Sequence, residues 1–207
     1  MKIEQYLSGP LQVNCYLVYD EMKKAFIVDP GGFNQALVDS VKEKDLTVEY
    51  IILTHGHGDH IGGVPKLQKL YPGVKVLACE KEKDFLGDVR QNFTMETLGA
   101  AIAITPDVCV NDGDTLTVGN MELKFLGTPG HTKGGMCIYN AENHVLFSGD
   151  TLFRTSIGRT DFPGGSFQEI EESIHTKLFV LPEETIVLPG HMGQTTIKFE
   201  KEMNPFV

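Results

Sequence analysis

The stretch that decides the fold reads Tyr50-Ile51-Ile52-Leu53-Thr54-His55-Gly56-His57-Gly58-Asp59-His60. Its four apolar residues are typical of a buried strand. Residues 60–71, which follow, place apolar side chains at helical spacings. The polar cluster is therefore expected in a turn between the end of a strand and the start of a helix. Three histidines and one aspartate within six residues are hard to explain as an ordinary helix start.

The spacing inside this cluster favours metal binding. His55 and His57 lie two residues apart in extended chain, so their side chains point the same way. Asp59 and His60 open the predicted helix, where Asp59 is expected to serve as the N-cap. Imidazole and carboxylate groups together suit zinc, iron or manganese. The cluster is interpreted as one part of a metal site.

Three further apolar strands end in tight turns, and each turn carries one more candidate ligand. They are residues 121–126 before His131, 144–148 before Asp150, and 185–188 before His191. Strand ends at one edge of a sheet are where a rigid scaffold presents functional groups. Seven ligands are too many for one tetrahedral ion and fit two ions that share a carboxylate. Asp150, with two oxygens, is the expected bridge.

Three other polar residues are weighed against this pattern. Asp29 follows the apolar run 24–28 and precedes Pro30. It either accepts the second N–H of a ligand histidine or forms a turn, and both interpretations remain open. His144 and His175 lack the strand-end context, so surface or packing roles are expected for them.

The rest of the chain predicts mixed β-sheets covered by helices. Further strands are predicted at 2–7, 12–19, 24–28, 75–78, 115–118 and 136–140, and helices at 34–44, 60–71 and 167–179, with 81–104 helical in part. Strands outnumber helices and do not alternate strictly with them. That argues against a doubly wound parallel sheet. A chain of 207 residues suits one large domain or two small ones.

Composition limits the partners. The net charge of −10 makes nucleic acid an unfavourable partner. The four cysteines form no C-x-x-C pair, so free thiols in a reducing compartment are expected. Residues 1–6 contain no apolar signal segment, and no apolar run approaches the roughly 20 residues that span a bilayer. We therefore expect a cytoplasmic protein that does not insert into a membrane.

These motifs together resemble the complete set of the metallo-β-lactamase superfamily. The set consists of His55-x-His57-x-Asp59-His60, His131, Asp150 and His191, with Asp29 matching the first motif. The resemblance implies a four-layer αββα sandwich of two mixed sheets flanked by helices. It also implies two divalent metal ions, with zinc expected and iron or manganese as alternatives. One ion takes His55, His57 and His131, the other takes Asp59, His60 and His191, and Asp150 bridges them.

Within that superfamily the sequence is most similar to short glyoxalase-II-like proteins. The markers are Asp29-Pro30-Gly31-Gly32, Gly158-Arg159-Thr160-Asp161-Phe162-Pro163-Gly164-Gly165 and Asn204-Pro205-Phe206. Two-domain glyoxalase II enzymes add a helical C-terminal domain that helps to bind glutathione. This sequence ends shortly after His191, so we expect a single domain over residues 1–207. A monomer is expected.

The implied activity is hydrolysis of a small-molecule thioester such as S-lactoylglutathione. The thiol that is released has a pKa of about 8.5, so its thiolate can leave without a strong general acid. The few acid and base residues of the motifs are therefore enough for this reaction. Asp59 or a metal would manage the remaining proton. The resemblance gives Arg159 a contact with the thiol part of the substrate. The alternative is that Arg159 pairs with Asp161 and shapes the loop over residues 155–160.

Other members of the superfamily supply the alternatives. A persulfide dioxygenase would use one iron held by His55, His131 and Asp150. A lactonase of the same superfamily is another alternative. A nuclease is disfavoured by the acidic charge, and a secreted β-lactamase by the missing signal segment.

Overall fold

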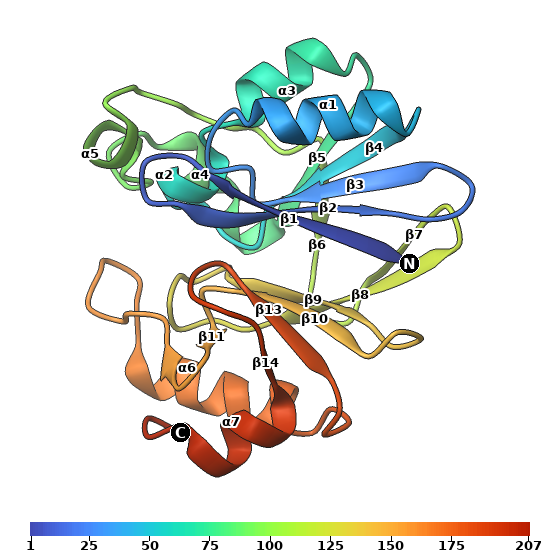
Figure 1. Ribbon diagram of the computed structural model, residues 1–207. Helices are drawn as coiled ribbons and strands as arrows, with labels where there is room; N and C mark the ends of the chain where they lie inside the picture. Colours follow the sequence, from blue (N-terminus) through green and yellow to red (C-terminus); the bar gives the residue numbers. More distant parts are fainter.

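The protein, described over residues 1–207 by a computed structural model, contains two six-stranded sheets that pack face to face (Figure 1). The first sheet has the order β1 (Lys2–Ser8), β2 (Val13–Tyr19), β3 (Lys24–Val28), β4 (Thr47–Ile52), β5 (Lys75–Cys79), β6 (Val108–Val110). The second has the order β14 (Thr195–Thr196), β13 (Ile186–Pro189), β10 (Val145–Gly149), β9 (Met136–Asn140), β8 (Met121–Gly127), β7 (Thr115–Val118). A small hairpin joins β11 (Leu152–Phe153) to β12 (Ser156–Ile157).

Both sheets are mixed, as the sequence predicted. In the first sheet β1, β2 and β3 pair antiparallel, and β3 to β6 run parallel. In the second sheet β10 and β13 run parallel, and the other neighbours run antiparallel. Parallel neighbours bring their carboxyl ends to one sheet edge. In the first sheet β4 supplies such an end, and in the second β10 and β13 do.

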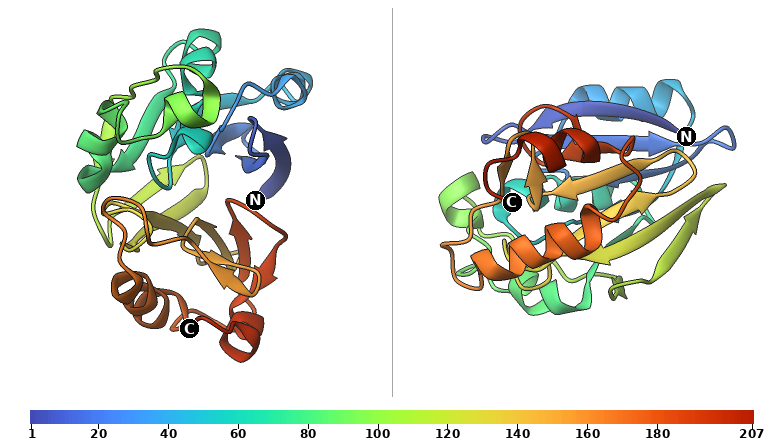
Figure 2. Two further views of the ribbon diagram at one scale, coloured as in Figure 1. Left: turned by 90° about the vertical axis from the view of Figure 1, so that its left-hand side faces the viewer. Right: turned by 90° about the horizontal axis from the view of Figure 1, so that it is seen from below.

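Helices cover the outer face of each sheet. They are α1 (Gln35–Glu43), α2 (Gly58–Ile61), α3 (Val64–Leu70), the 3₁₀ turn Glu80–Glu82, α4 (Lys83–Gly87), α5 (Thr94–Leu98), α6 (Phe167–Ser173), the π-helical turn Ile174–Leu178 and α7 (Ile197–Met203). In Figure 1, α1 and α3 lie outside the first sheet, and α6 and α7 lie outside the second. The left view of Figure 2 shows the same layers from another side, and the right view, from below, shows α6 and α7 in front of the second sheet. This is the αββα sandwich that the resemblance implied.

Strand alternation creates separate cores between these layers. In β3, Ala25 and Ile27 pack toward the outer helices, whereas Phe26 and Val28 pack between the two sheets. This is the period-two pattern of a strand buried on both faces. A third core, which contains Leu146 of β10, lies between the second sheet and its helices. The sandwich therefore contains three apolar layers.

The predicted helix over 60–71 is wrong in detail, because the structure divides it into α2 and α3. Gly62 and Gly63 lie at the break. A Cβ atom at Gly62 would stand 2.4 Å from the carbonyl oxygen of Gly31, and one at Gly63 would stand 2.6 Å from that of Gly32. This close approach of two backbones fixes the end of α2 against the loop that follows β3.

Other differences involve short elements. The sequence missed β6, β14 and α7, although Thr196 caps α7 by accepting the N–H of Phe199. The stretch 155–160 was predicted as a loop, but Ser156 and Ile157 pair with Leu152–Phe153. Two-residue strands carry too short a pattern to be recognised. None of the helices has the length and apolar character that crossing a bilayer requires.

Candidate metal centre

The seven predicted ligands meet at one edge of the sandwich. Those of the first sheet follow β4, with His55 and His57 in the loop and Asp59 and His60 in α2. Those of the second sheet follow β8, β10 and β13, as His131, Asp150 and His191. The candidate ligand atoms form three overlapping groups whose members lie within 4.8 Å of one another: His55, His57 and His131; His55, His60 and Asp150; and Asp59, His60 and His191.

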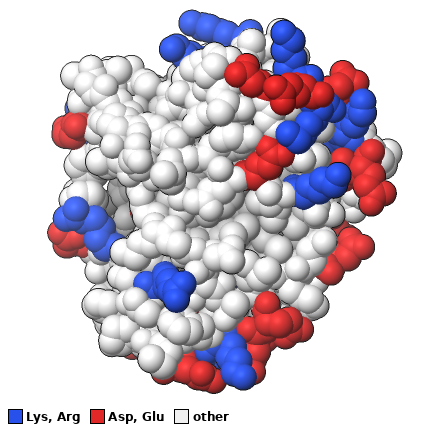
Figure 3. All heavy atoms as spheres, in the orientation of Figure 1, with Lys and Arg blue, Asp and Glu red and all other residues white.

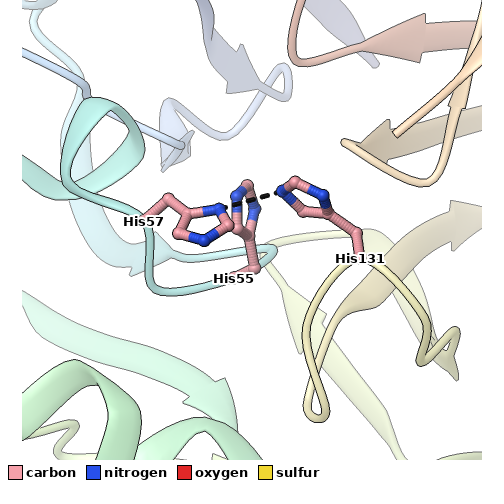
Figure 4. A group of neighbouring side chains, drawn as sticks. All are labelled: His55, His57 and His131. Atoms are coloured by element: carbon pink, nitrogen blue, oxygen red, sulfur yellow. Dashed lines mark hydrogen bonds between the residues drawn. The ribbon is translucent and has the colours of Figure 1, made fainter. Parts of the chain in front are cut away.

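The first cluster consists of His55, His57 and His131 (Figure 4). His57 Nδ1 lies 2.9 Å from His131 Nε2. The other ring nitrogen of His131, Nδ1, lies 2.7 Å from the carbonyl oxygen of Arg159 and donates its N–H to it. The Nε2 atom of His131 therefore presents a lone pair to the cluster. Lone pairs that converge in this way suit a cation.

The second cluster consists of Asp59, His60 and His191. His191 Nε2 lies 3.1 Å from Asp59 Oδ2, and His60 Nε2 lies 3.8 Å from the same oxygen. The prediction that Asp59 caps the helix is wrong, because α2 begins at Gly58 and its N-cap is His57. The carboxylate of Asp59 turns instead toward His191, in the candidate centre.

Asp150 lies between the two clusters. Its Oδ1 atom is 3.3 Å from His60 Nε2 in the second cluster. Its Oδ2 atom is 3.7 Å from His131 Nε2 in the first cluster and 3.7 Å from His191 Nε2 in the second. A single carboxylate thus reaches ligand atoms of both groups.

Asp29 lies directly behind the clusters. Its Oδ2 atom accepts the Nδ1–H of His60 at 2.9 Å and the hydroxyl of Thr54 at 2.6 Å. Thr54 Oγ1 lies 3.2 Å from His55 Nδ1 and can accept its N–H. Of the two interpretations that the sequence left open, the structure therefore places Asp29 where it orients a histidine. It also lies in a left-handed turn, with φ 47°.

Buried polar atoms without hydrogen-bond partners indicate that the two clusters and Asp150 suit metal ions. His55 Nε2, His60 Nε2 and Asp150 Oδ1 are buried without a hydrogen-bond partner. A buried polar atom left unsatisfied costs about 1–3 kcal/mol, so three together at one edge point to ligands of a bound cation. Gly190 leaves room for them, because a Cβ atom there would stand 2.4 Å from Asp150 Oδ1.

Electrostatics keeps the first cluster in the form that binds metal. Burial, with the neighbouring imidazoles, holds the pKa of His55 well below its usual value and lowers that of His57 to about 3. Burial also opposes the charged form of His60, but the Asp150 and Asp29 carboxylates raise its pKa well above the usual value. The two clusters therefore differ in charge. In the first, burial keeps His55 and His57 neutral, whereas in the second the carboxylates favour the charged form of His60 as long as no metal is bound.

Sequence reasoning missed Glu82, which connects two of the ligand loops. This residue is 1% exposed. Its Oε1 atom accepts the N–H of Gly56 at 3.0 Å, and its Oε2 atom accepts the N–H of Gly134 at 2.8 Å. Gly56 lies between two ligand histidines, and Gly134 lies in the loop that carries His131. No motif marks Glu82, because its partners are backbone groups far away in the sequence.

A cavity of about 470 Å³ opens beside the clusters. Its apolar lining consists of Leu11, Phe93, Phe153, Ile157, Phe162 and Met192. Arg159 also lines the cavity. Its guanidinium pairs with Asp161, with Nε to Oδ1 at 2.8 Å and Nη2 to Oδ2 at 2.7 Å. The pairing with Asp161 that the sequence allowed therefore exists, and the residue faces the cavity as well.

The remaining histidines and the cysteines lie elsewhere. His144 is 44% exposed at its side chain, and His175 packs edge-on against Phe179. All four cysteines are free. Burial raises the pKa of the Cys137 thiol to about 11, and that of Cys15 still further. Neither thiol is poised to act as a nucleophile, because the reactive form is the thiolate.

Comparison with known proteins agrees with this geometry. The sequence profile of the Metallo-beta-lactamase superfamily matches residues 8–191. A Haemophilus influenzae protein named hydroxyacylglutathione hydrolase GloC is 37% identical over 100% of this chain and 98% of its own length.

Two solved structures are also similar over nearly the whole chain. The BLEG-1 B3 metallo-beta-lactamase is 40% identical, with a TM-score of 0.93 and 99% of both chains covered. TTHA1623, solved in a di-iron-bound form, is 32% identical, with a TM-score of 0.86, and the match covers 99% of this chain and 100% of that one. The profile match, the full-length relative and the cluster of histidines and aspartates together show that this chain belongs to the metallo-β-lactamase superfamily of metal-dependent hydrolases.

Proposed function

We propose that the protein is a dinuclear metal-dependent hydrolase of thioesters. The observation that carries this proposal is the position of Asp150, whose two oxygens face ligand atoms of both clusters. Two ions sharing one carboxylate are a common arrangement for hydrolysis. The proposed ligands are His55, His57 and His131 for one ion, and Asp59, His60 and His191 for the other.

The metal ions would supply Lewis-acid chemistry, lowering the pKa of a water molecule and polarising a substrate carbonyl. The chain's own groups do the rest. His131 and His60 present their Nε2 atoms in orientations fixed by their second ring nitrogens, and His60 would give up its Nε2 proton when a metal binds. Asp59 lines the cavity and can hold the proton that the reaction releases.

The reaction adds the oxygen of one water to the acyl carbon and breaks the C–S bond. The products are a carboxylic acid, which ionises, and a thiol. A thiol is a good leaving group, so the cavity needs no strong general acid. This agrees with its lining, in which the only titratable groups besides the proposed ligands are Glu96 and Arg159. We assign Arg159 a contact with the thiol half of the substrate.

Zinc is the metal we propose, with iron as the alternative. Imidazole and carboxylate ligands suit both. The di-iron form of TTHA1623 supports testing for iron. A persulfide dioxygenase would need iron at His55, His131 and Asp150 only, so a second metal ion bound by Asp59 and His191 would argue against it.

β-Lactam hydrolysis is a second candidate activity, favoured by the similarity to BLEG-1. Lactone hydrolysis uses the same chemistry at the acyl carbon. We would measure metal content per chain and then turnover of a thioester, a lactone, a cephalosporin and glutathione persulfide. Two metal equivalents with thioester turnover at least tenfold above the others are expected. Oxygen uptake with the persulfide, or faster cephalosporin cleavage, would contradict the proposal.

A further inference from the structure

The outer wall of the cavity is apolar and partly aromatic. Phe93 and Phe162 stack with ring centroids 4.7 Å apart, and both line the cavity. Leu11 and Met192 also line it, and each is more than half exposed. Exposed apolar side chains around a cavity favour an apolar or uncharged part of a ligand.

The charges of this wall do not favour an anion. Apart from the proposed metal ligands, the only cation that lines the cavity is Arg159. Its guanidinium is held in a two-fold contact by the Asp161 carboxylate and lies over the Phe162 ring, 3.7 Å from the centroid. Glu96, which also lines the cavity, forms no ion pair. On the face that Figure 3 draws, charged side chains gather mainly at the upper right and along the lower edge. Few lie on the left, which is the side of α2 in Figure 1.

We propose that the cavity selects thioesters whose thiol half carries no carboxylate, and that Asp161 sets this preference. The inference rests on the proposed thioester hydrolysis. A substrate carboxylate that reached Arg159 would have to displace Asp161 or lie beside it, and Glu96 adds another negative charge to the cavity lining. The two-fold contact uses Nε and Nη2 of Arg159, so Nη1 stays free to donate to a neutral amide carbonyl. The preferred thiol is therefore uncharged, with an amide group.

The test compares two substrates that share one acyl group. S-Lactoylglutathione carries two carboxylates on its thiol half, whereas S-lactoyl-N-acetylcysteamine carries an amide and no charge. With the metal-loaded wild-type protein, kcat/KM is expected to be at least tenfold higher for the neutral thioester. Preference for S-lactoylglutathione would overturn the inference while supporting thioester hydrolysis. Turnover of neither substrate would contradict the proposed function itself.

Asp161→Asn tests the role of the residue. It should lower KM for S-lactoylglutathione about fivefold, leave kcat nearly unchanged, and change kcat/KM for the neutral thioester less than twofold. A merely structural role would instead change both substrates equally. Glu96→Gln, which removes the other exposed carboxylate, should shift the same ratio in the same direction. If neither variant changes the ratio, Asp161 does not set the preference.

Asp45→Asn is the matched control. Asp45 also forms an exposed ion pair, 2.8 Å from Lys23, but it does not line the cavity. The variant should keep the wild-type ratio between the two substrates. An equal shift in Asp45→Asn would assign the effect to net charge and would contradict the specific role of Asp161.

Discussion

The polar cluster around Glu4 differs from the edge of the sandwich that carries the seven candidate ligands, here called the metal edge. The two regions differ in whether their buried polar atoms have hydrogen-bond partners. Glu4 lies on β1 and accepts hydrogen bonds from the hydroxyls of Tyr6 at 2.5 Å, Tyr19 at 2.8 Å and Ser40 at 2.6 Å. Lys44 stands 3.2 Å away. Although burial works against ionisation, these partners lower the pKa of Glu4 to about 2. The carboxylate is fully satisfied by the chain itself.

At the metal edge the chain leaves polar atoms without partners. His55 Nε2, His60 Nε2 and Asp150 Oδ1 are buried and make no hydrogen bond. A satisfied cluster contributes to folding, whereas an unsatisfied one costs folding free energy that a bound ligand can offset. The difference teaches that unpartnered polar atoms that converge on one another, as these three do, mark the functional edge better than polar residues as such. The predictions below test this division.

The largest effect is expected for Asp150→Ala. Because its carboxylate faces both clusters, the variant should lose at least one metal equivalent and about 10³-fold or more in turnover. The metal-free protein should also lose stability, since buried His60 loses one of the carboxylates that favour its charged form. Elemental analysis, kinetics and thermal unfolding measure the three effects. Full occupancy by two ions would refute the bridging assignment, and Glu4→Gln, which should keep both ions, is the control.

Asp29→Asn should give the next largest effect. An amide is a weaker acceptor for the Nδ1–H of His60 than the carboxylate is, so His60 becomes a poorer ligand. Metal affinity should fall about 10–100-fold, measured by competition with a chromophoric chelator. Unchanged affinity would mean that Asp29 only shapes its turn.

Glu82→Gln addresses the first cluster alone. The single amide oxygen of Gln cannot accept from both the Gly56 and Gly134 N–H groups, so one loop loses its partner. Stability should fall by about 1–3 kcal/mol. Metal bound at His55, His57 and His131 should weaken before that of the second cluster, which stepwise metal titration would detect. Equal weakening of both metals would show that Glu82 supports the whole edge rather than these loops.

The Glu4 cluster should give the smallest effect, and it should appear only in acid. The folded pKa of Glu4, about 2, lies below its usual value of 4.5, so its stabilisation is present above pH 4.5 and is lost as pH falls toward 2. The side chain is 27% exposed, so we expect about 1–2 kcal/mol after allowing for solvent screening. Denaturant titrations between pH 5 and 2 measure it. Glu4→Gln should flatten this dependence and leave turnover unchanged, and a steep dependence in that variant would contradict the assignment.

Much of the candidate centre could be predicted because its signals are local. Four ligands stand within six residues after β4, and each of the other three follows its own apolar strand by a few residues. The strand patterns are equally local, so the mixed sheets could be predicted from them. Asp59 lies with the other candidate ligands as predicted, but the prediction that it caps the helix is wrong, because Asp favours helix starts only in general.

The sequence by itself determined which residue types would gather and at which strand ends, because the turn chemistry and the period-two pattern act between near neighbours. Only the tertiary structure decided how those residues pair. His191 meets Asp59 across 132 positions, and Glu82 meets Gly134 across 52. Such contacts depend on how the two sheets face each other and on which strand ends lie side by side. The contacts of Arg159 with Asp161 and with the Phe162 ring are local in sequence. Only the tertiary structure, however, places Arg159 and Phe162 in the lining of the cavity.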